Sequence, residues 1–464
     1  MTIPLETLTK EQGDRVLSQQ ESHFLDFKAI EIAPAKLTRT ISAFANASGG
    51  ELFIGIDETE VMGSKYYSWR GFKTMESGKG HLQIFEELFP LGQYFSYTFL
   101  SHPSAPGLVL YAEVRKSRQV SNASDGVAYI RRGPQNLPQT SPEQIHRLKL
   151  DKGIISFEND TVDVPKEVVS NSYPILEFLT TVVPTAEPEP WLEKQRLLVG
   201  GKPSVSGILL FAEEPQAALP KRCAIKLYRY KSSDPSGSRE TLAFDPLTIE
   251  GHLYKQIQDG VRQTVAVVES VQKLGPSGLE NITYPHETLH EILTNAVLHR
   301  DYSIASDVHI RVFDNRIEIE SPGKLPGHVT EDNILEEQYA RNPSIVRLIN
   351  KFPNPPNKDV GEGLNTAFNA MNKLRLKPPI IAEKDNSVLI TIRHEPLASP
   401  DQTIMEYLES HTEIANQIAR KITGIPSENS MKKIFSRLKD RGEIELVPGK
   451  TGRAAVWRKK TGTV

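Results

Sequence analysis

The hydrophobic pattern changes character three times along this chain, and these changes constrain its fold more than any single motif does. Strand-like runs alternate with helical segments up to about residue 150. Residues 151–275 combine helices and proline-rich turns with the strand-like runs "GILLFAEE" and "CAIKLYRY". Residues 276–396 combine a long helix, the hairpin pattern "HIRVFDNRIEIESPG" and a helix after a glycine loop. Because 464 residues are too many for one core, we expect a multidomain α/β and α+β protein with domains at 1–150, 151–275, 276–396 and 397–464.

Composition excludes several classes of protein. Cys223 is the single cysteine, which excludes a disulfide framework and a cysteine-based zinc cluster and favours a reducing compartment. No apolar run approaches the length that a membrane helix needs, and the first residues, "MTIPLETLTKEQGDR", lack the basic end and apolar stretch of a signal peptide. We therefore expect a cytoplasmic protein with no membrane partner.

The last 65 residues carry a strong local pattern. "DQTIMEYLES", "TEIANQIARKIT" and "SENSMKKIFSRLKDRGEIELVPGKTGRAAVWRK" predict three helices and a two-stranded wing with a tight "PGKTG" turn. Ile414, Ile418 and Ile422 recur at helical spacing in the second helix, and Ser427 is placed to cap the third. The predicted buried stripe of the third helix consists of Met431, Ile434, Phe435 and Leu438. This pattern predicts a winged helix-turn-helix, whose third helix normally enters a major groove.

The charge of this segment agrees with a nucleic-acid contact. From Ser427 onward there are ten Lys and Arg against four Asp and Glu, a net charge of +6, although the whole chain is at −3. The DNA-binding candidates are Lys432, Lys433, Arg437, Lys439, Lys450 and Arg453. The alternative is a winged helix that binds another protein and whose charges are simply solvated.

A second pattern lies at residues 287–302, "ETLHEILTNAVLHRDY", which puts Glu291 and Asn295 on one helix face. This face resembles that of GHKL ATPases, and "RIEIESPGKLP", "ARNPSI" and "KDVGEGLNTAFNAM" resemble the divergent GHKL-like α/β sandwich of RecG-like and Schlafen-like bacterial regulators. The resemblance implies that Glu291 activates water and that Asn295 holds Mg²⁺ on the phosphates of ATP. The implied nucleotide-binding residues are Glu291, Asn295, Gly323, Gly361 and Gly363.

This zone also departs from the GHKL pattern. Ser321, Pro322 and Gly323 stand where most GHKL proteins have "DNGxG", so the aspartate that accepts the adenine amino group is absent. Two alternatives stay open: the glycines form an ordinary turn, and His299, Arg300 and Asp301 form an internal ion-pair cluster.

The stretch "ESHFLDFK" at residues 21–28 predicts a strand in which Asp26 and Lys28 share one face. This pair is either a solvated ion pair or part of a metal or phosphate site. The helix that follows, "APAKLTRTISAFANASGG", has Leu37, Ile41, Phe44 and Ala45 on one apolar face.

These residues, together with "TRTISAFANASGGELFIGIDE" and "VSNASDGVAYIRRG", resemble the Schlafen-type AlbA-like α+β domain, also called divergent AAA. The matching positions are Glu21, Asp26, Lys28, Asn46, Gly49, Gly50, Gly55 and Asp57. The resemblance implies Glu21, Asp26 and Asp57 as ligands of Mg²⁺ or Mn²⁺ in RNA cleavage, with Lys28 on the scissile phosphate. Asp26 replaces the more usual Glu, and only one lobe of the usual duplicated pair is present, so a homodimer would supply the second.

The alternative for this domain is binding without cleavage. Its basic residues would then contact phosphates: Lys28, Arg39, Arg115, Lys116, Arg118, Arg131 and Arg132. We interpret the chain as a DNA-binding transcriptional regulator that forms homo-oligomers, with RNA as a further partner. The alternatives are a metal-dependent ribonuclease in stress or phage defence, and a nucleotide-sensing switch. We expect Glu21, Asp26 and Asp57 to converge beside Lys28.

Overall fold

The computed structural model describes residues 4–87, 94–219, 222–275, 278–282, 284–356, 363–374, 376–394, 400–423, 425, 427–447 and 455–460. Its residues group into two units, Met1–Met371 with Pro378–Arg393, and Asn372–Lys377 with His394–Val464. The first unit contains two large sheets of mixed strand direction and the second a small one, so the chain is a multidomain mixed α/β protein. Within the described ranges, no helix combines the length and apolar character that crossing a bilayer requires.

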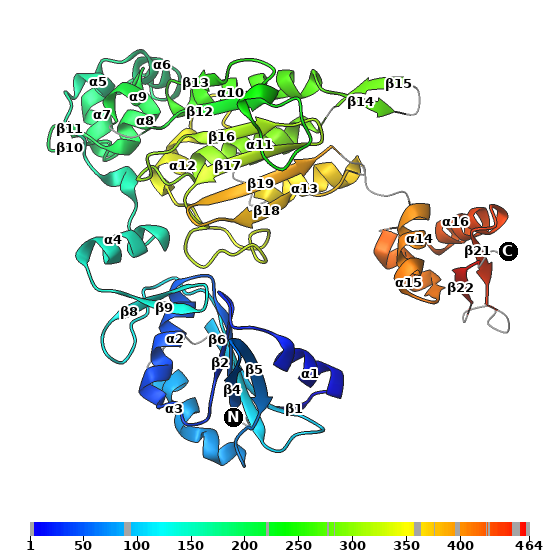
Figure 1. Ribbon diagram of the computed structural model, residues 1–464. Helices are drawn as coiled ribbons and strands as arrows, with labels where there is room; N and C mark the ends of the chain where they lie inside the picture. The colour runs from blue at the N-terminus through cyan, green and yellow to red at the C-terminus, as the bar shows by residue number, and fades with distance from the viewer. Residues whose placement is uncertain are drawn as a thin grey trace. The chain divides into compact units, whose positions relative to one another are not determined.

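The N-terminal part of the first unit is built on a five-stranded sheet (Figure 1). Its strand order is β1 (Leu5–Thr7), β6 (Phe95–Ser101), β7 (Leu108–Val114), β3 (Gly50–Ile54) and β2 (Leu25–Lys28). Strand β1 runs parallel to β6 and β2 runs parallel to β3, whereas the two central pairings are antiparallel. The strand predicted at residues 21–28 is therefore an edge strand of this sheet.

Helix α2 (Pro34–Asn46) covers one face of this sheet. The predicted apolar face is confirmed, because Leu37, Ile41, Phe44 and Ala45 are fully buried in one hydrophobic cluster with strand residues of β3 and β7. A side chain at Gly50 would place its Cβ 2.5 Å from the Phe44 ring. The glycine that ends the helical segment thus lets β3 start directly against α2.

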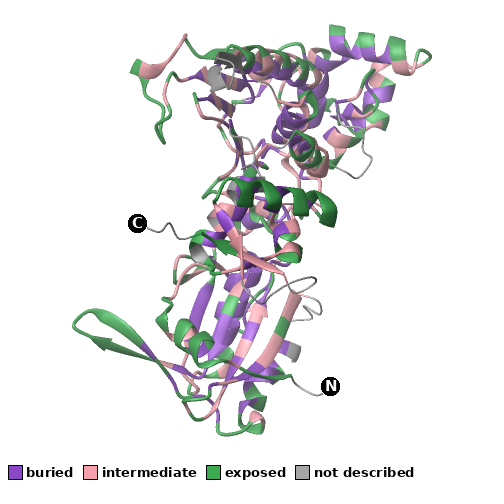
Figure 2. Ribbon diagram, turned by 90° about the vertical axis from the view of Figure 1, so that its right-hand side faces the viewer, coloured by how far each residue is buried: buried purple, intermediate pink, exposed green. Residues whose placement is uncertain are grey.

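The opposite face is covered by α1 (Lys10–Ser18) and by the hairpin of β4 (Ile56–Val61) and β5 (Ser64–Trp69). Phe27, Phe53, Tyr67 and Trp69 pack together in this second cluster. Most of the hairpin beyond this cluster is exposed to solvent. Figure 2 shows the buried residues concentrated in the sheets and on the helix faces that meet them.

The remaining N-terminal elements are α3 (Lys79–Glu87), the hairpin of β8 (Ala128–Arg132) and β9 (Gln135–Gln139), and α4 (Pro142–Asp151).

A group of short helices joins the two large sheets: α5 (Glu167–Ser170), α6 (Tyr173–Val182), α7 (Pro188–Lys194), α8 (Val205–Phe211) and α9 (Pro215–Ala218). The strand predicted at "GILLFAEE" is wrong, because its first five residues, 207–211, belong to α8 and the last three lie in no strand. Ser204 caps this helix by accepting a hydrogen bond from the Gly207 amide, and every residue of the helix is buried. A short continuous apolar run fits a buried helix as well as a buried strand, so periodicity could not separate the two.

The second large sheet has six strands, in the order β13 (Leu247–Ile249), β12 (Ile225–Arg229), β16 (Val308–Val312), β17 (Arg316–Pro322), β19 (Ser387–Arg393) and β18 (Ile380–Glu383). The predicted hairpin is confirmed as the antiparallel pair β16–β17, and the strand at "CAIKLYRY" is confirmed as β12. Helices α10 (Leu253–Glu269) and α11 (His286–Leu298) contact each other and this sheet (Figure 1). A small hairpin, β14 (Gln272–Gly275) and β15 (Gly278–Asn281), joins them, and α12 (Pro343–Ile349) and α13 (Gly363–Lys373) follow β17.

The second unit contains α14 (Pro400–Ser410), α15 (Asn416–Thr423) and α16 (Glu428–Asp440). Its antiparallel sheet has the order β20 (Ile414–Ala415), β22 (Val456–Lys459) and β21 (Ile444–Leu446). The stripe predicted for α16 is confirmed, because Met431, Ile434, Phe435 and Leu438 are buried, and Ser427 caps the helix.

The prediction for the preceding helix was partly wrong. Ile414 lies on β20, opposite Trp457, and Ile418 is 41% exposed. Helix α15 therefore begins only at Asn416, because the residues before it are needed as a strand for the small sheet. The predicted "PGKTG" turn lies outside the described residues.

Candidate functional site

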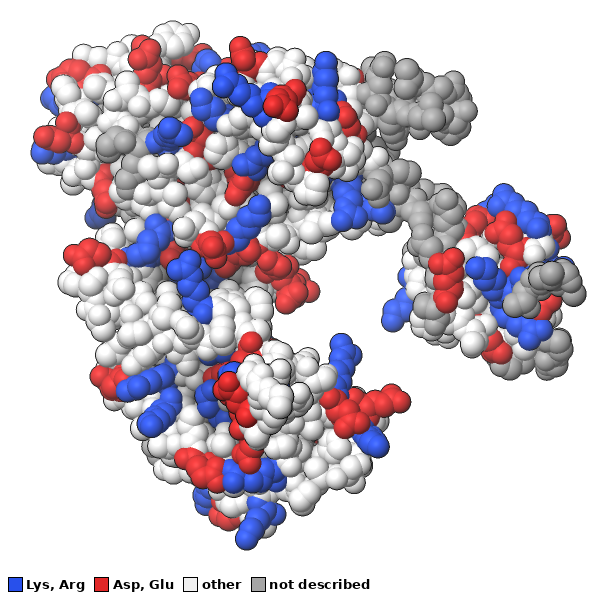
Figure 3. Space-filling model, in the orientation of Figure 1, with Lys and Arg blue, Asp and Glu red and all other residues white. Residues whose placement is uncertain are grey.

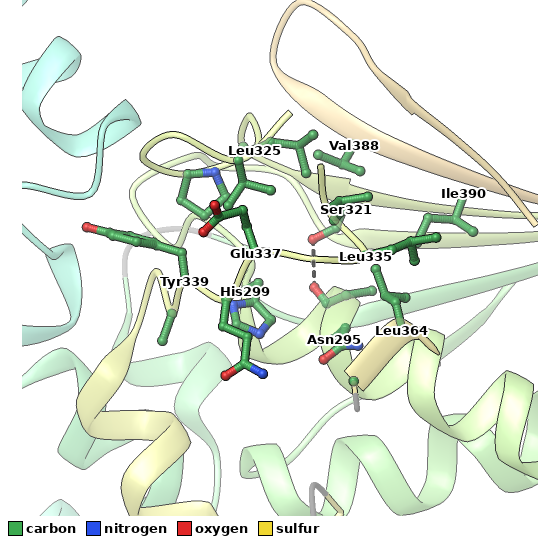
Figure 4. A pocket seen from close by; sticks show the side chains of 18 of the residues that line it. Asn295, His299, Ser321, Leu325, Leu335, Glu337, Tyr339, Leu364, Val388 and Ile390 are labelled. Atoms are coloured by element: carbon green, nitrogen blue, oxygen red, sulfur yellow. Dashed lines mark hydrogen bonds between the residues drawn. The ribbon is translucent and has the colours of Figure 1, made fainter. Parts of the chain in front are cut away.

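A cavity of about 350 Å³ lies in the central part of the first unit, between α11, the end of β17, the start of α13 and the segment 324–340. Its polar lining includes Glu291, Asn295, His299, Ser321 and Glu337. Figure 4 shows Leu335, Leu364 and Ile390 gathered at one end of this pocket and His299, Glu337 and Tyr339 toward the other. The pocket thus has an apolar end and a polar end, as expected for a site that binds an organic ligand with a charged group.

Helix α11 presents Glu291 and Asn295 to the pocket from successive turns. The Asn295 side-chain amide donates a hydrogen bond to Glu291 Oε1 at 2.8 Å. Burial raises the pKa of Glu291, and the hydrogen bond from Asn295 opposes this shift. The structure therefore brings the two predicted residues together as one polar pair that can accept a proton or contact a hydrated cation.

Two of the three predicted glycines also line this pocket, whereas Gly361 lies outside the described residues. Gly323 has a φ of +105°, and a Cβ there would lie 2.6 Å from Asp301 Cβ, so packing alone requires glycine at this position. Gly363 starts α13, and among the described residues the nearest heavy atom to a Cβ there would be Glu291 Oε1 at 4.0 Å. No side chain in the described part of the chain therefore crowds the Gly363 backbone on the side of Glu291.

Ser321 occupies a position at which the expected GHKL pattern has an aspartate. Its hydroxyl donates a hydrogen bond to the carbonyl oxygen of Ala296 at 2.6 Å, which ties β17 to α11 (Figure 4). The carboxylates in the lining come from Glu291 and Glu337 instead. Ser321 is therefore a structural link that also borders the cavity.

The residues after α11 divide into a pocket residue and an internal network. Burial, together with the charge of Arg341, lowers the pKa of His299 to about 4, so this lining residue is neutral at pH 7. Asp301 is paired with Arg147 and with Arg341, whereas Arg300 donates hydrogen bonds to backbone carbonyls that include that of Ser306. Arg300 and Asp301 thus belong to an internal polar cluster, which is one of the two alternatives that the sequence left open.

Most of the segment 324–340 was not identified from the sequence as part of a site, since only its ends fall within the quoted "RIEIESPGKLP" and "ARNPSI". Leu325, Val329, Leu335, Glu337 and Tyr339 all line the cavity from it. The segment has neither helical nor strand periodicity, so no pattern marks its inward-facing residues.

The acidic residues of the N-terminal sheet do not assemble as expected. Lys28 Nζ lies 2.8 Å from Asp26 Oδ1 and 3.4 Å from Glu21 Oε1, but Asp57 pairs with Arg70 at 2.9 Å. Among the described residues, no group of three or more His, Cys, Asp or Glu side chains could hold a metal ion. Glu21 and Asp26 therefore meet beside Lys28 as predicted, whereas Asp57 pairs with Arg70, so the predicted set of three carboxylate ligands does not form.

The surroundings of Asp26 explain this outcome. Asp26 is 1% exposed, lies 3.3 Å from Arg131, and accepts a hydrogen bond from the Thr40 hydroxyl. Burial alone would raise the pKa of Asp26, but the charges of Lys28 and Arg131 outweigh it and lower the pKa. Because cationic side chains already neutralise this carboxylate, the residues do not fit a divalent ion.

The basic residues predicted for phosphate contact in this domain do not form one free surface. Lys116 and Arg131 are buried and donate hydrogen bonds to backbone carbonyls. Arg39 pairs with Asp125, and Arg118 contacts His328. Arg115 lies 3.5 Å from Glu113, and Arg132 is exposed.

In the second unit, the four described basic candidates Lys432, Lys433, Arg437 and Lys439 are exposed on α16. Figure 3 shows Lys and Arg side chains on this unit beside acidic ones. Lys432 pairs with Glu428 at 2.7 Å, and Arg437 Nε donates to Asp401 at 2.9 Å. Lys433 and Lys439 make no ion pair with any residue that the structure describes, and Lys450 and Arg453 lie outside those residues.

Comparisons with known families define the class of the first unit. Residues 21–140 match the family model described as "Schlafen, AlbA_2". Residues 305–392 match the model described as "Putative ATP-dependent DNA helicase recG C-terminal". The chain therefore carries a Schlafen-type AlbA_2 domain followed by a RecG-type C-terminal domain. The second match includes Ser321, Gly323 and Gly363 and starts after Glu291 and Asn295.

Solved structures are also similar to this chain. A crystal structure of the DIP2311 protein from Corynebacterium diphtheriae has 16% sequence identity and a TM-score of 0.39, covering 97% of this chain and 96% of that chain. A solution structure of the N-terminal domain of a RecG-related protein from Nitrosomonas europaea has 17% identity and a TM-score of 0.21, covering 23% of this chain and 72% of that chain. A search of curated proteins finds no match.

Proposed function

We propose that this chain is a DNA-binding regulatory protein that contacts duplex DNA through α16. The observation that carries the proposal is the division of α16 into a buried apolar stripe and an exposed face with Lys432, Lys433, Arg437 and Lys439. Three helices and a small antiparallel sheet are the elements of a winged helix, in which the third helix enters the major groove. The family model that matches residues 305–392 is described as part of a putative DNA helicase, and this description supports an association with DNA.

The ion pairs of α16 give its four cations different roles. Glu428 and Asp401 already neutralise Lys432 and Arg437, and the Arg437 pair also ties α16 to α14. Lys433 and Lys439 are therefore the side chains with most charge to offer to phosphate oxygens. Replacing both by Ala is expected to weaken duplex binding roughly tenfold, because each phosphate contact adds a salt-dependent increment.

This proposal is tested by equilibrium binding of the full chain to fluorescent duplex DNA. The parent should bind, Lys433→Ala/Lys439→Ala should bind more weakly on every sequence, and the charge-matched control Lys194→Ala/Lys351→Ala should bind as the parent does. Lys194, on α7, and Lys351, just after α12, are exposed residues of the first unit. Equal affinities of parent and Lys433→Ala/Lys439→Ala would favour an α16 that contacts another protein.

We also propose a nucleotide, ATP with Mg²⁺, as the ligand of the central pocket. The cavity has the size of a small-molecule site, and the N-terminus of the 11-residue α13 borders it beside Glu291. Asn295 and Glu291 would hold the ion, which would neutralise phosphate charge. Metal-dependent RNA cleavage is not part of the proposal, because Lys28 and Arg131 neutralise Asp26.

A further inference from the structure

Residues of the N-terminal domain contact the segment 324–340, which forms one wall of the central pocket. Lys116, two residues after β7 in the Schlafen-type domain, donates hydrogen bonds from Nζ to the carbonyl oxygens of Leu325 at 2.6 Å and Val329 at 3.1 Å. Leu325 and Val329 both line the pocket. Glu383 of β18 completes this contact, since it accepts a hydrogen bond from the Leu325 amide at 2.8 Å and lies 3.8 Å from Lys116 Nζ.

A second contact reaches the pocket through a histidine. Arg118 Nε donates a hydrogen bond to His328 Nδ1 at 3.0 Å, and His328 Nε2 lies 2.6 Å from Glu337 Oε2. Glu337 is itself a lining residue, and the hydrogen bond to His328 lowers its pKa. Arg118 of the N-terminal domain is therefore linked to this pocket carboxylate through His328.

A third contact comes from the residues directly after α4. The Tyr339 hydroxyl donates a hydrogen bond to the Gly153 carbonyl oxygen at 2.6 Å, and Tyr339 also lines the pocket. Gly153 has a φ of +66°, and a Cβ there would lie 2.6 Å from the Tyr339 ring. Glycine at 153 thus allows the ring to pack directly on the backbone.

We propose that Lys116 and Arg118 are positioning residues for the central pocket. Their contacts hold the segment 324–340 in its ordered conformation, and an ordered segment in turn strengthens these contacts between the two domains. The reason is that the same short segment, 324–340, forms the wall and receives all three contacts. By linkage, a ligand that orders this segment must strengthen the contact, and the contact must strengthen ligand binding by the same factor. The part of the inference that concerns ATP rests on the proposed nucleotide site.

Burial makes Lys116 the more sensitive of the two residues. It is 7% exposed, and burial lowers its pKa while Glu383 opposes that shift. Removing its ammonium group leaves the carbonyls of Leu325 and Val329 without their donor in a buried place, which loosens the segment. Arg118 is exposed, so Arg118→Gln removes the contact to His328 without leaving a buried charge.

Hydrogen exchange measured by mass spectrometry on the full chain tests this inference. Without ligand, Lys116→Met and Arg118→Gln should each raise amide exchange across residues 324–340, and Lys116→Arg should restore part of the protection. Lys149→Met is the matched control, because Lys149 is an exposed residue of α4 outside these contacts. Exchange in 324–340 that is unchanged in both variants would overturn the proposal.

The second arm adds ATP and Mg²⁺ and separates this inference from the proposed function. Protection should appear in the parent at the start of α13 and also at residues 114–118, and Lys116→Met should weaken ATP binding several-fold. Protection at α13 without any change at 114–118 would overturn the coupling and leave the nucleotide site intact. If ATP protects neither region, the nucleotide proposal fails, and the ligand-free arm alone decides whether Lys116 and Arg118 position the wall.

Discussion

Lys28 Nζ and Asp26 Oδ1 lie 2.8 Å apart on one face of an edge strand, and the carboxylate of this pair is almost completely removed from solvent. Arg131, from the β8–β9 hairpin, lies 3.3 Å from the same oxygen, and the Thr40 hydroxyl of α2 donates a hydrogen bond to Asp26 Oδ2. Asp26 therefore works as a buried junction between β2, α2 and β8, and not as an exposed ligand for a cation.

The first prediction concerns this junction. Asp26→Asn should destabilise the N-terminal domain by about 3 kcal/mol, because it leaves Lys28 and Arg131 without their shared counter-charge. Asp57→Asn is the control, since its pair with Arg70 is more exposed and should contribute much less. The measurement is urea unfolding followed through the N-terminal domain. Equal destabilisation by the two variants would show that the ion pairs of Asp26 contribute no more to the free energy of unfolding than the Asp57–Arg70 pair does.

The second prediction concerns pH. Burial and the nearby charge of Lys116 lower the pKa of Lys152 to about 7, and its Nζ donates hydrogen bonds to the carbonyls of Ala45 and Ser117. Between pH 7 and the ordinary lysine pKa, the unfolded chain binds this proton and the folded chain does not. The free energy of unfolding therefore rises with pH across that window.

Comparison with Lys152→Met isolates this effect from other titrating groups. The stability of the parent relative to Lys152→Met should increase by about 2 kcal/mol between pH 7 and pH 9, in addition to a constant loss from the missing hydrogen bonds. Lys149→Met, on the exposed side of α4, should show no such trend. A difference between parent and Lys152→Met that does not vary with pH would mean that Lys152 keeps an ordinary pKa.

The third prediction concerns the central pocket. ATP with Mg²⁺ should raise the unfolding temperature of the parent, because a ligand stabilises the state that binds it. Asn295→Ala should lose this shift, since Asn295 supplies the amide beside Glu291. Asn369→Ala, at an exposed position of α13, should keep it. A parent protein that shows no shift with ATP would remove the nucleotide from the proposal.

Much of the local structure could be predicted from the sequence, because α2, α16 and the β16–β17 hairpin each have a clear period and clear end signals. Helix α8 was predicted as a strand because its buried residues show no period. The metal site was predicted wrongly for a different reason. Sequence spacing placed Asp26 beside Lys28, but it could not reveal that Arg131, more than 100 positions later, packs against the same carboxylate. Likewise, the contact between Lys116 and Leu325 joins residues 209 positions apart, and no local pattern encodes it.

The salt dependence of duplex binding tests the central claim, that α16 contacts DNA phosphates, most directly. The logarithm of the binding constant falls linearly with the logarithm of the salt concentration, with a slope of about −0.9 for each phosphate contact. We predict that Lys433→Ala/Lys439→Ala lowers the magnitude of this slope by about 2, whereas Lys194→Ala/Lys351→Ala leaves it at the parent value. A slope in Lys433→Ala/Lys439→Ala equal to that of the parent would contradict the claim that this face of α16 contacts DNA.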